Sequence, residues 1–313
     1  MKKVSLLIVL ALLLNFTPKV FAEEVEFQAV SYTAPITLHW LAKAGVPEAV
    51  EFIGNLSAQN ILNQTPINDK ERVERANAVY QEIRYASLNS FIAEEGYTTI
   101  MDLGCGVSPR GIFMTRKGID YIGVELEAVT QTLEEYTPMF LTDEQLNHIH
   151  FATADVTDRK AMLKAVENSP GKVCIITENL TNYLSMEQQK AMLENIREIL
   201  KIHGGCFVTS DHLADEIFMD SASAIYGKKS AESILDESAK IYENTAEINF
   251  SDTFFDTPKE AMEFIKEQGF KIEVRPLFTK PQDLYSIRSL NDKQIKKIKN
   301  FMTKKLLWVM TTQ

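Results

Sequence analysis

The sequence is poor in cysteine and histidine, the residues that build disulfide frameworks and zinc sites. Its 313 residues include three cysteines, Cys105, Cys174 and Cys206, and all three fall in or beside predicted strands. We interpret this odd-numbered set as small buried hydrophobic residues rather than as a disulfide framework. The five histidines show no ligand pattern, and no Cys/His cluster has zinc spacing. The sequence therefore predicts no metal site.

Basic residues are also in deficit, with 33 Lys and Arg against 43 Asp and Glu and a formal net charge of −10. Such a chain would be repelled by a phosphate backbone, which argues against general nucleic-acid binding. We find no internal apolar run long enough to span a bilayer, no internal repeat and no low-complexity segment. The hydrophobic content of 45% is ordinary for a globular protein, and the length allows a sizeable core.

The N-terminus is different in kind from the rest of the chain. A short basic start precedes the apolar stretch Val4–Phe16, Pro18 ends that stretch, and residues 20–22 fit a small-residue cleavage site. This pattern is typical of a secretory signal peptide and is short for a membrane span. We expect removal of residues 1–22 to leave a secreted or periplasmic protein with no stable membrane span. The protein is expected in the cytoplasm if the signal does not function.

The most informative stretch is TTIMDLGCGVSPRG, at positions 98–111. A short apolar run predicts a buried strand that ends near Asp102. The turn Gly104–Gly106 follows, and Ser108 and Pro109 predict the N-cap and first turn of a helix. A strand, a glycine turn and a helix N-terminus form the cradle on which α/β proteins bind nucleotide-like cofactors.

The glycine spacing of this cradle discriminates among cofactors. A dinucleotide fingerprint, G-x-G-x-x-G, would place its third glycine at Pro109, and Gly111 comes too late. The diphosphate of NAD needs close backbone approach to the helix start, whereas S-adenosylmethionine has no phosphate and needs only the tight turn. The spacing therefore favours a methyl donor, and an ordinary strand-to-helix turn without a ligand is the alternative.

Acidic residues mark the ends of two further predicted strands. The strand over 121–126 carries Glu125, roughly 20 residues after Gly104, where a carboxylate can accept hydrogen bonds from both ribose hydroxyls. The strand over 149–155 ends at Asp155. Each acid alone would be interpreted as a solvated loop residue. Because the carboxyl ends of neighbouring parallel strands converge on the ligand crevice, we expect these acids to meet there.

Strands and helices alternate along the chain from residue 98, which favours a parallel sheet with helices on both faces. The predicted strands span 98–103, 121–126, 149–155, 173–178, 205–210, 270–277 and 306–312, and the helices between the first five span 109–117, 127–136, 158–168 and 186–203. The predicted fold class is α/β, a Rossmann-like seven-stranded, mostly parallel sheet with one antiparallel strand and an N-terminal helical cap.

With these elements in place, the chain resembles a class I S-adenosylmethionine-dependent methyltransferase, and within that class the leucine carboxyl methyltransferase family. The resemblance covers roughly residues 72–215. DLGCGVSPRG at 102–111 stands where the family has acidic-Leu-Gly-x-Gly-x-x-x-Arg, and ENLTNYLS at 178–185 stands where it has Glu-Gly-x-x-x-Tyr-Leu. Asn179 departs from the family glycine. The C-terminal third matches poorly, so the resemblance does not identify the methyl acceptor.

The resemblance implies a site for S-adenosylmethionine. Arg84 would pair with the donor carboxylate, for which a guanidinium fork is well suited. Glu125 would hold the ribose hydroxyls, Asp155 with Val156 would border the adenine, and Glu178 would lie beside the sulfonium and the amino group. The whole predicted cofactor site comprises Arg84, Asp102, Gly104, Cys105, Gly106, Glu125, Asp155, Val156 and Glu178.

The reaction we expect is O-methylation of a carboxylate or hydroxyl on a small or peptidic substrate. A carboxylate acceptor needs no general base, whereas a hydroxyl does. Tyr183 and His212 are the candidate catalytic residues, and Asn179 is a further acceptor-side candidate. Tyr183 is equally interpretable as a core aromatic residue, and His212 as an ordinary loop histidine. Two other functions stay open: an exported, catalytically inactive methyltransferase-fold binding protein, and an NAD-dependent oxidoreductase, which the missing glycine disfavours.

This interpretation divides the chain into a signal peptide (1–22), an N-terminal helical cap (23–95) and a methyltransferase domain (96–313). Helices over 37–53 and 70–93 are expected to cap the crevice. An insertion at about 212–256, predicted as mixed helix and loop, is expected to shape the substrate pocket. Export would separate the protein from the cytoplasm, where S-adenosylmethionine is made, and the sequence does not resolve this conflict. It gives no indication of the oligomeric state.

Overall fold

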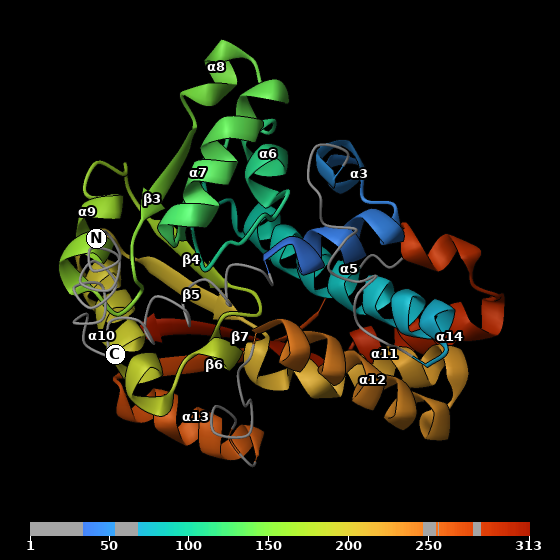
Figure 1. Cartoon of the computed structure of the whole chain (residues 1–313). Coiled ribbons are helices and arrows are strands. Elements are labelled where there is room, and N and C mark those ends of the chain that lie inside the picture. Colours follow the sequence, from blue (N-terminus) through green and yellow to red (C-terminus); the bar gives the residue numbers. More distant parts are fainter. Residues whose placement is uncertain (1–33, 54–67, 247–254, 256, 278–282) are drawn as a thin grey trace, which may run out of the picture.

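One seven-stranded sheet organises the part of the chain that the computed structural model describes, namely residues 34–53, 68–246, 255, 257–277 and 283–313. The strand order is β3-β2-β1-β4-β5-β7-β6 (Figure 1). The predicted signal peptide lies outside the described residues. Within the described ranges, no helix has both the length and the apolar character needed to cross a membrane.

The strand pairing confirms the predicted fold class. The strands are β1 (Thr99–Leu103), β2 (Asp120–Glu125), β3 (Ile149–Thr153), β4 (Val173–Thr177), β5 (Gly205–Thr209), β6 (Phe270–Pro276) and β7 (Lys305–Thr312). The first five pair in parallel, and β7 is antiparallel to both β5 and β6. Strands β1 and β4 are buried along their whole length, as expected for central strands covered on both faces.

Helices that connect the parallel strands cover both faces of the sheet (Figure 1). These helices are α6 (Arg110–Thr115), α7 (Glu127–Tyr136), α8 (Asp143–Leu146), α9 (Arg159–Val166) and α10 (Met186–His203). Helix α10 shows why its segment folds as predicted. The Ser185 hydroxyl accepts the N–H of Gln188, the Gln188 side chain accepts the N–H of Ser185, and the buried stripe of α10 faces the sheet.

The N-terminal helices differ from the prediction of a single helix over 37–53. The chain forms one helix over 34–44 and a second, α3 (Pro47–Ile53), because Gly45 between them has a φ of 92°. The long helix α5 (Lys70–Glu95) is buried on most of its circumference. It packs against α11, α12 and the short helix η6 (Ser286–Ser289), so it is a core helix as well as a cover.

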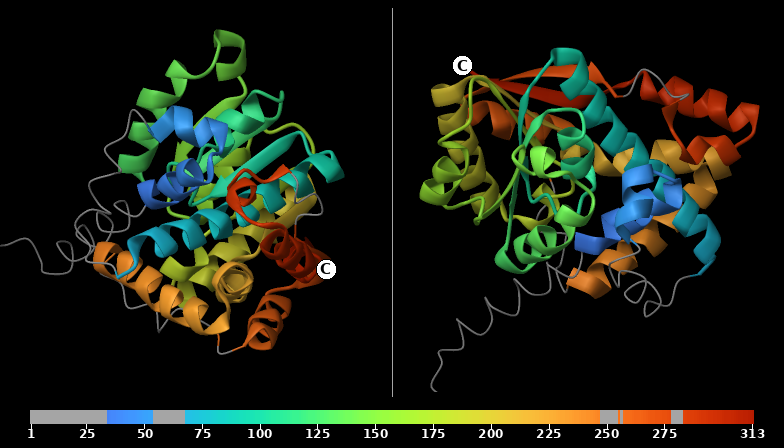
Figure 2. Two further views of the ribbon diagram at one scale, coloured as in Figure 1. Left: turned by 90° about the vertical axis from the view of Figure 1, so that its right-hand side faces the viewer. Right: turned by 90° about the horizontal axis from the view of Figure 1, so that it is seen from above.

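The insertion after β5 is more helical than predicted. Its described part consists of the short helix η3 (Asp211–Leu213) and two long helices, α11 (Ala214–Tyr226) and α12 (Lys228–Ala246). The long helices pack on each other and on α5, and both views of Figure 2 show them beside α5, to one side of the sheet. Residues 247–254 and 256 of the predicted insertion lie outside the described residues.

The C-terminal part completes the sheet. Helix α13 (Pro258–Glu267) precedes β6, and α14 (Asp292–Met302) precedes β7 and packs on α11. The three cysteines are free and buried, as predicted for small hydrophobic residues. The main core extends from α5 across the sheet to α10 and β7, and it holds the carboxyl ends of β1, β2, β4 and β5 in fixed positions.

Candidate functional site

The glycine turn after β1 has the backbone conformation that a tight turn requires. Gly104 and Gly106 have φ values of 60° and 52°, a region that favours glycine. The Gly104 N–H donates to the Val124 carbonyl at 2.9 Å, which folds the turn over β2. A Cβ on Gly104 would lie 2.6 Å from Leu180 Cδ1, so the segment after β4 lies directly against the turn. Cys105, between the two glycines, is buried.

The helix after this turn starts one residue later than predicted. Helix α6 begins at Arg110, and Pro109 rather than Ser108 is the N-cap. Pro109 has nearly helical angles, with φ −73° and ψ −1°, so the observed and predicted helix starts differ by a single residue. The Ser108 hydroxyl still accepts the N–H of Arg110 at 3.3 Å, which satisfies one free donor at the helix start.

Glu125 at the end of β2 contacts the glycine turn directly. Its Oε2 accepts the N–H of Gly106 at 3.0 Å, and its Oε1 accepts the N–H of Leu126 at 2.8 Å. Burial raises the pKa of Glu125 above its ordinary value, although these two donors oppose the shift. Glu125 therefore lies beside the glycine turn, and its role in holding the ribose hydroxyls stays a prediction.

The end of β3 joins the same edge of the sheet. The Ala154 N–H donates to the Glu125 carbonyl at 3.0 Å. Asp155 is half-buried, and its Oδ1 accepts both the N–H and the hydroxyl of Thr157 at 2.8 Å. Val156 is buried. The structure thus brings the Gly104 turn, Glu125 and Asp155 together, while their contacts with a cofactor stay predictions.

Arg110 is the central residue that the sequence prediction missed. It donates to Asp102 Oδ2 at 3.0 Å, to Asn89 Oδ1 at 2.9 Å, and to Glu178 Oε2. Tyr121 also donates its hydroxyl to Asp102 at 2.9 Å. Asp102 is 1% exposed, so it lies beneath the site and supports Arg110 rather than facing a ligand. Burial raises the pKa of Asp102, and the Arg110 charge opposes that rise.

Glu178, after β4, is bonded through only one of its two carboxylate oxygens. Oε2 accepts from Arg110, whereas Oε1 is buried and accepts no hydrogen bond within the described part of the chain. The Glu178 side chain is 6% exposed. Arg110 is shared by two carboxylates, Asp102 and Glu178, and the second oxygen of Glu178 receives no donor from the described residues. A buried acceptor in this state is rare in native structures and suits a cationic ligand.

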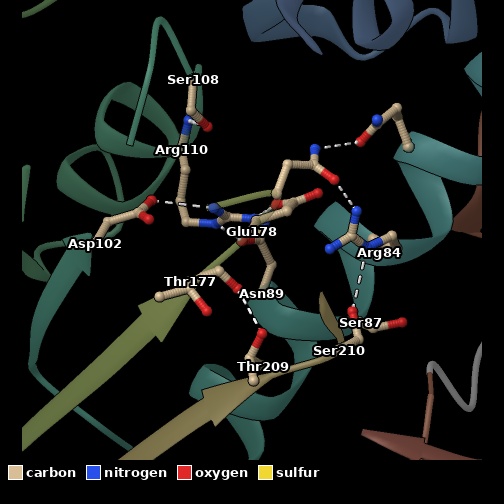
Figure 3. A network of polar contacts seen from close by, with 12 residues as sticks. Arg84, Ser87, Asn89, Asp102, Ser108, Arg110, Thr177, Glu178, Thr209 and Ser210 are labelled. Carbon is tan, nitrogen blue, oxygen red and sulfur yellow. Dashed lines mark hydrogen bonds and ion pairs between the residues drawn. The ribbon is translucent and has the colours of Figure 1, made fainter. Parts of the chain in front are cut away.

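Arg84, on α5, is the second buried arginine, and Figure 3 shows Glu178 between it and Arg110. Its guanidinium forms an ion pair with Asp211 and donates to Asn179 Oδ1, to Ser210 Oγ at 3.2 Å and to Tyr80 Oη at 2.7 Å. The Arg84 and Asp211 side chains are both 0% exposed. Breaking such a buried pair by removing one partner costs about 3–5 kcal/mol. The protein therefore already bonds four of the five N–H donors of the arginine that was predicted to bind the donor carboxylate.

Asp211, at the end of β5, fixes the position of the segment that follows β4 (residues 178–181). Its carboxylate accepts three successive N–H groups, those of Asn179 at 2.9 Å, Leu180 at 3.2 Å and Thr181 at 3.3 Å. Burial alone would raise the pKa of Asp211, but the Arg84 charge and these donors lower it below its usual value. The signal for Asp211 was present in the sequence, because it is another acid that follows a strand.

The left-handed backbone of Asn179 explains its departure from the family glycine. Its φ is 68°, a conformation that glycine adopts freely and asparagine tolerates better than most residues. The side chain adds bonds that glycine lacks, because its amide accepts from Arg84 and donates to Gln81 Oε1 at 3.2 Å. Asn179 is therefore a structural part of the segment, and this leaves its predicted acceptor-side role untested.

The two candidate catalytic residues lie after neighbouring strands. Tyr183 is half-buried in the short helix η2 (Thr181–Tyr183), which packs against η3, where His212 lies. The His212 ring contacts the rings of Trp308 and Phe255, with centroids 5.4 and 5.5 Å away. Burial lowers the pKa of His212 from 6.5 to about 4, although Asp211 opposes the shift. His212 is therefore neutral at pH 7.

Asp215, in the first turn of α11, adds a carboxylate on the same side. Burial raises its pKa, and the Arg84 charge opposes the rise. Across the described ranges, no group of three or more His, Cys, Asp or Glu side chains is arranged to hold a metal ion.

Comparisons with known proteins add low-identity structural likenesses. No protein-family model and no curated protein sequence matches the chain. The methyltransferase domain of bacterial CtHen1-CN is 13% identical, covering 74% of this chain and 99% of that chain, with a TM-score of 0.44. Magnesium protoporphyrin IX methyltransferase ChlM from Synechocystis PCC 6803, with bound SAH, is 14% identical, and the match covers 71% of this chain and 86% of that chain with a TM-score of 0.40. The glycopeptide N-methyltransferase MtfA, complexed with sinefungin, is 13% identical, and the match covers 71% of this chain and 83% of that chain with a TM-score of 0.39.

Proposed function

We propose that the chain binds S-adenosylmethionine at the carboxyl ends of β1, β2 and β4 and transfers its methyl group. The observation that carries this proposal is the buried Oε1 of Glu178, which accepts no hydrogen bond from the part of the chain that the structure describes and lies in the segment packed against the glycine turn. S-adenosylmethionine bears a sulfonium, an ammonium and one carboxylate, and so has a net positive charge. A buried carboxylate oxygen without a partner stabilises such a ligand and repels a diphosphate.

The remaining contacts follow from the same edge of the sheet. Glu125 would accept hydrogen bonds from the ribose hydroxyls, and Gly104 and Gly106 allow close backbone approach. The adenine would lie beside Asp155 and Val156. The resemblance to class I methyltransferases supports this arrangement, and membership of the leucine carboxyl methyltransferase family remains our hypothesis.

For the acceptor, we propose an oxygen of a carboxylate or a hydroxyl on a small or peptidic substrate. Methyl transfer needs mainly in-line alignment of nucleophile, methyl carbon and sulfur, and such positioning alone is worth effective molarities of about 10⁵–10⁸ M. A hydroxyl acceptor would also need a base. His212 is neutral at pH 7 and can accept a proton, but its pKa of about 4 makes it a weak base.

The experiment that tests the donor site is isothermal titration of the purified full chain with S-adenosylmethionine, S-adenosylhomocysteine and NAD. We expect saturable heats with the first two and none with NAD. Absence of heat with both sulfur ligands would overturn the proposal, and binding of NAD alone would favour the oxidoreductase alternative. Binding without transfer to any acceptor would support the inactive binding protein.

The acceptor class is tested separately with methyl-labelled S-adenosylmethionine and a panel of small acids, alcohols and peptides. Label that mild alkali releases as methanol indicates a carboxyl methyl ester, whereas alkali-stable label indicates an ether or a methylamine. Predominantly methylamine product would refute O-methylation while leaving the donor site intact.

A further inference from the structure

We propose that Arg84 and Asp211 form a positioning pair, which fixes the segment after β4 so that Glu178 presents its free oxygen to the amino group of the donor. In this arrangement Arg84 does not itself bind the donor carboxylate. The inference rests on the proposed function, because it assigns roles around the same donor site.

The first argument is that Arg84 has no place for a ligand carboxylate. The guanidinium is 0% exposed, and its bonds go to Asp211, Asn179, Ser210 and Tyr80. A ligand carboxylate at Arg84 would have to displace Asp211, whose own charge would then be buried without a cation. The resemblance suggested a direct contact between Arg84 and the ligand, and the structure shows an arginine that the protein already satisfies.

The second argument is that Asp211 controls the backbone beside Glu178. Three consecutive N–H groups, from Asn179 to Thr181, point at this one carboxylate, and the first belongs to the residue that follows Glu178. Arg84 then holds Asp211 and the Asn179 side chain at once. The left-handed Asn179 turns the chain between Glu178 and these anchored amides.

The third argument is that the segment after β4 packs directly against the glycine turn of the proposed donor site. Leu180 occupies the space beside Gly104, where a Cβ would meet it at 2.6 Å. The other oxygen of Glu178 is fixed by Arg110. Arg110 therefore anchors the carboxylate and the Arg84–Asp211 pair anchors its backbone, so the free oxygen has one defined position. Loss of either anchor would let that position vary.

The two roles for Arg84 predict different ligand preferences. The test uses three ligands: S-adenosylhomocysteine, the same compound without its amino group, and the same compound without its carboxyl group. For the wild-type chain we expect the desamino compound to bind about tenfold or more weaker than S-adenosylhomocysteine, because one charged hydrogen bond is lost. The amino-group preference is the dissociation constant of the desamino compound divided by that of S-adenosylhomocysteine. The carboxyl-group preference is the same ratio for the compound without the carboxyl group. Effects that change the affinity for all three ligands equally cancel in these ratios.

If Arg84 and Asp211 act as a positioning pair, the amino-group preference falls to about threefold or less in Arg84→Met and in Asp211→Asn. The carboxyl-group preference stays as in the wild type. Arg75→Met is the matched control, because Arg75 is an exposed arginine on the same helix, and both preferences should be unchanged in it. Thermal denaturation followed by circular dichroism shows which variants fold. Arg84→Lys, which keeps a charge but loses the fork, replaces any unfolded Arg84→Met variant.

Loss of the carboxyl-group preference in an Arg84 variant, alone or with the other preference, would show that Arg84 binds the donor carboxylate and would overturn the inference. Unchanged amino-group preference in folded Arg84 and Asp211 variants would overturn it as well. A wild-type chain that binds none of the three ligands would instead refute the proposed function, so the two failures are distinguishable.

Discussion

The two sides of the candidate site differ in how their buried carboxylates are bonded. On one side, at the ends of β1, β2 and β4, Arg110 faces both Asp102 and Glu178, and one oxygen of Glu178 has no hydrogen-bond partner among the described residues. On the other side, at the end of β5, Arg84 forms an ion pair with Asp211, and that carboxylate also accepts three backbone N–H groups. We call these the β1–β4 side and the β5 side.

The difference shows where a ligand charge is needed. On the β5 side, the Arg84–Asp211 pair is neutral and each partner is bonded to several protein groups, so these two charges serve the protein's own structure. On the β1–β4 side, Asp102 and Glu178 share Arg110, and the half-buried Glu125 is bonded to two backbone N–H groups. A cationic ligand would complete that side, and the four predictions below test this division from the largest expected effect to the smallest.

The largest effect is expected for Arg110→Met, which leaves Asp102 and Glu178 buried without a cation. The free energy of unfolding should fall by about 3–5 kcal/mol, as measured by urea denaturation. Arg159→Met is the control, because Arg159 pairs with Glu198 on the surface and should matter by no more than about 1 kcal/mol. Equal losses for both variants would contradict the central role of Arg110.

The second effect concerns His212 on the β5 side. Its folded-state pKa of about 4 lies below the ordinary 6.5, so the unfolded chain binds the proton more tightly. The stabilisation from neutral His212 is present above pH 6.5 and is lost as the pH falls from 6.5 towards 4. It amounts to on the order of 3 kcal/mol.

The measurement is the free energy of unfolding at pH 7 and at pH 4.5 for the wild type and for His212→Gln. The variant should lose less stability on acidification than the wild type. An NMR titration that places the His212 midpoint near 6.5 would contradict the burial of this ring and would restore it as a base suited to neutral pH.

The third effect tests the carboxylates of the β1–β4 side. Glu125→Gln should weaken S-adenosylhomocysteine binding by roughly 10- to 100-fold, because charged hydrogen bonds are worth about 1.5–3 kcal/mol. Glu127→Gln, at an exposed position on α7, is the control and should bind as the wild type does. Isothermal titration measures both. Equal affinity in the two variants would remove Glu125 from the donor site.

The smallest effect lies at Asn179, where the two sides meet. Asn179→Ala and Asn179→Gly both lose the side-chain bonds, but only alanine strains the left-handed backbone at φ 68°. We expect the glycine variant to be more stable than the alanine variant by about 1 kcal/mol in urea denaturation. An alanine variant as stable as the glycine variant would show that the backbone conformation is not held at this position.

Much of the fold was predictable because its signals are local. The alternation of apolar runs with capped helices gave the strands, and the Gly104–Gly106 turn with Glu125 identified the edge of the sheet where they meet. The break at Gly45 and the long helices α11 and α12 were not predicted. A single glycine such as Gly45 does not by itself indicate a helix end. A polar amphipathic segment such as α12 is easily interpreted as partly loop.

The partners of the buried charges were not predictable, because nothing local encodes them. Arg84 and Asp211 are separated by 127 positions, and Arg110 and Glu178 by 68. Arg84 was assigned a ligand only through resemblance, and sequence patterns cannot show that a protein carboxylate already occupies its guanidinium. Arg110 was visible in the motif, but its role emerges only when β1 and β4 are adjacent.

The position of β7 has a consequence for how the chain is made. Strand β6 joins the sheet only through β7, yet β7 is synthesised after it. During translation, β5 therefore has one unpaired edge and β6 has no partner strand until the ribosome has added β7, which ends at Thr312. Exposed strand edges invite intermolecular pairing, so nascent or truncated chains should depend on chaperones that shield them.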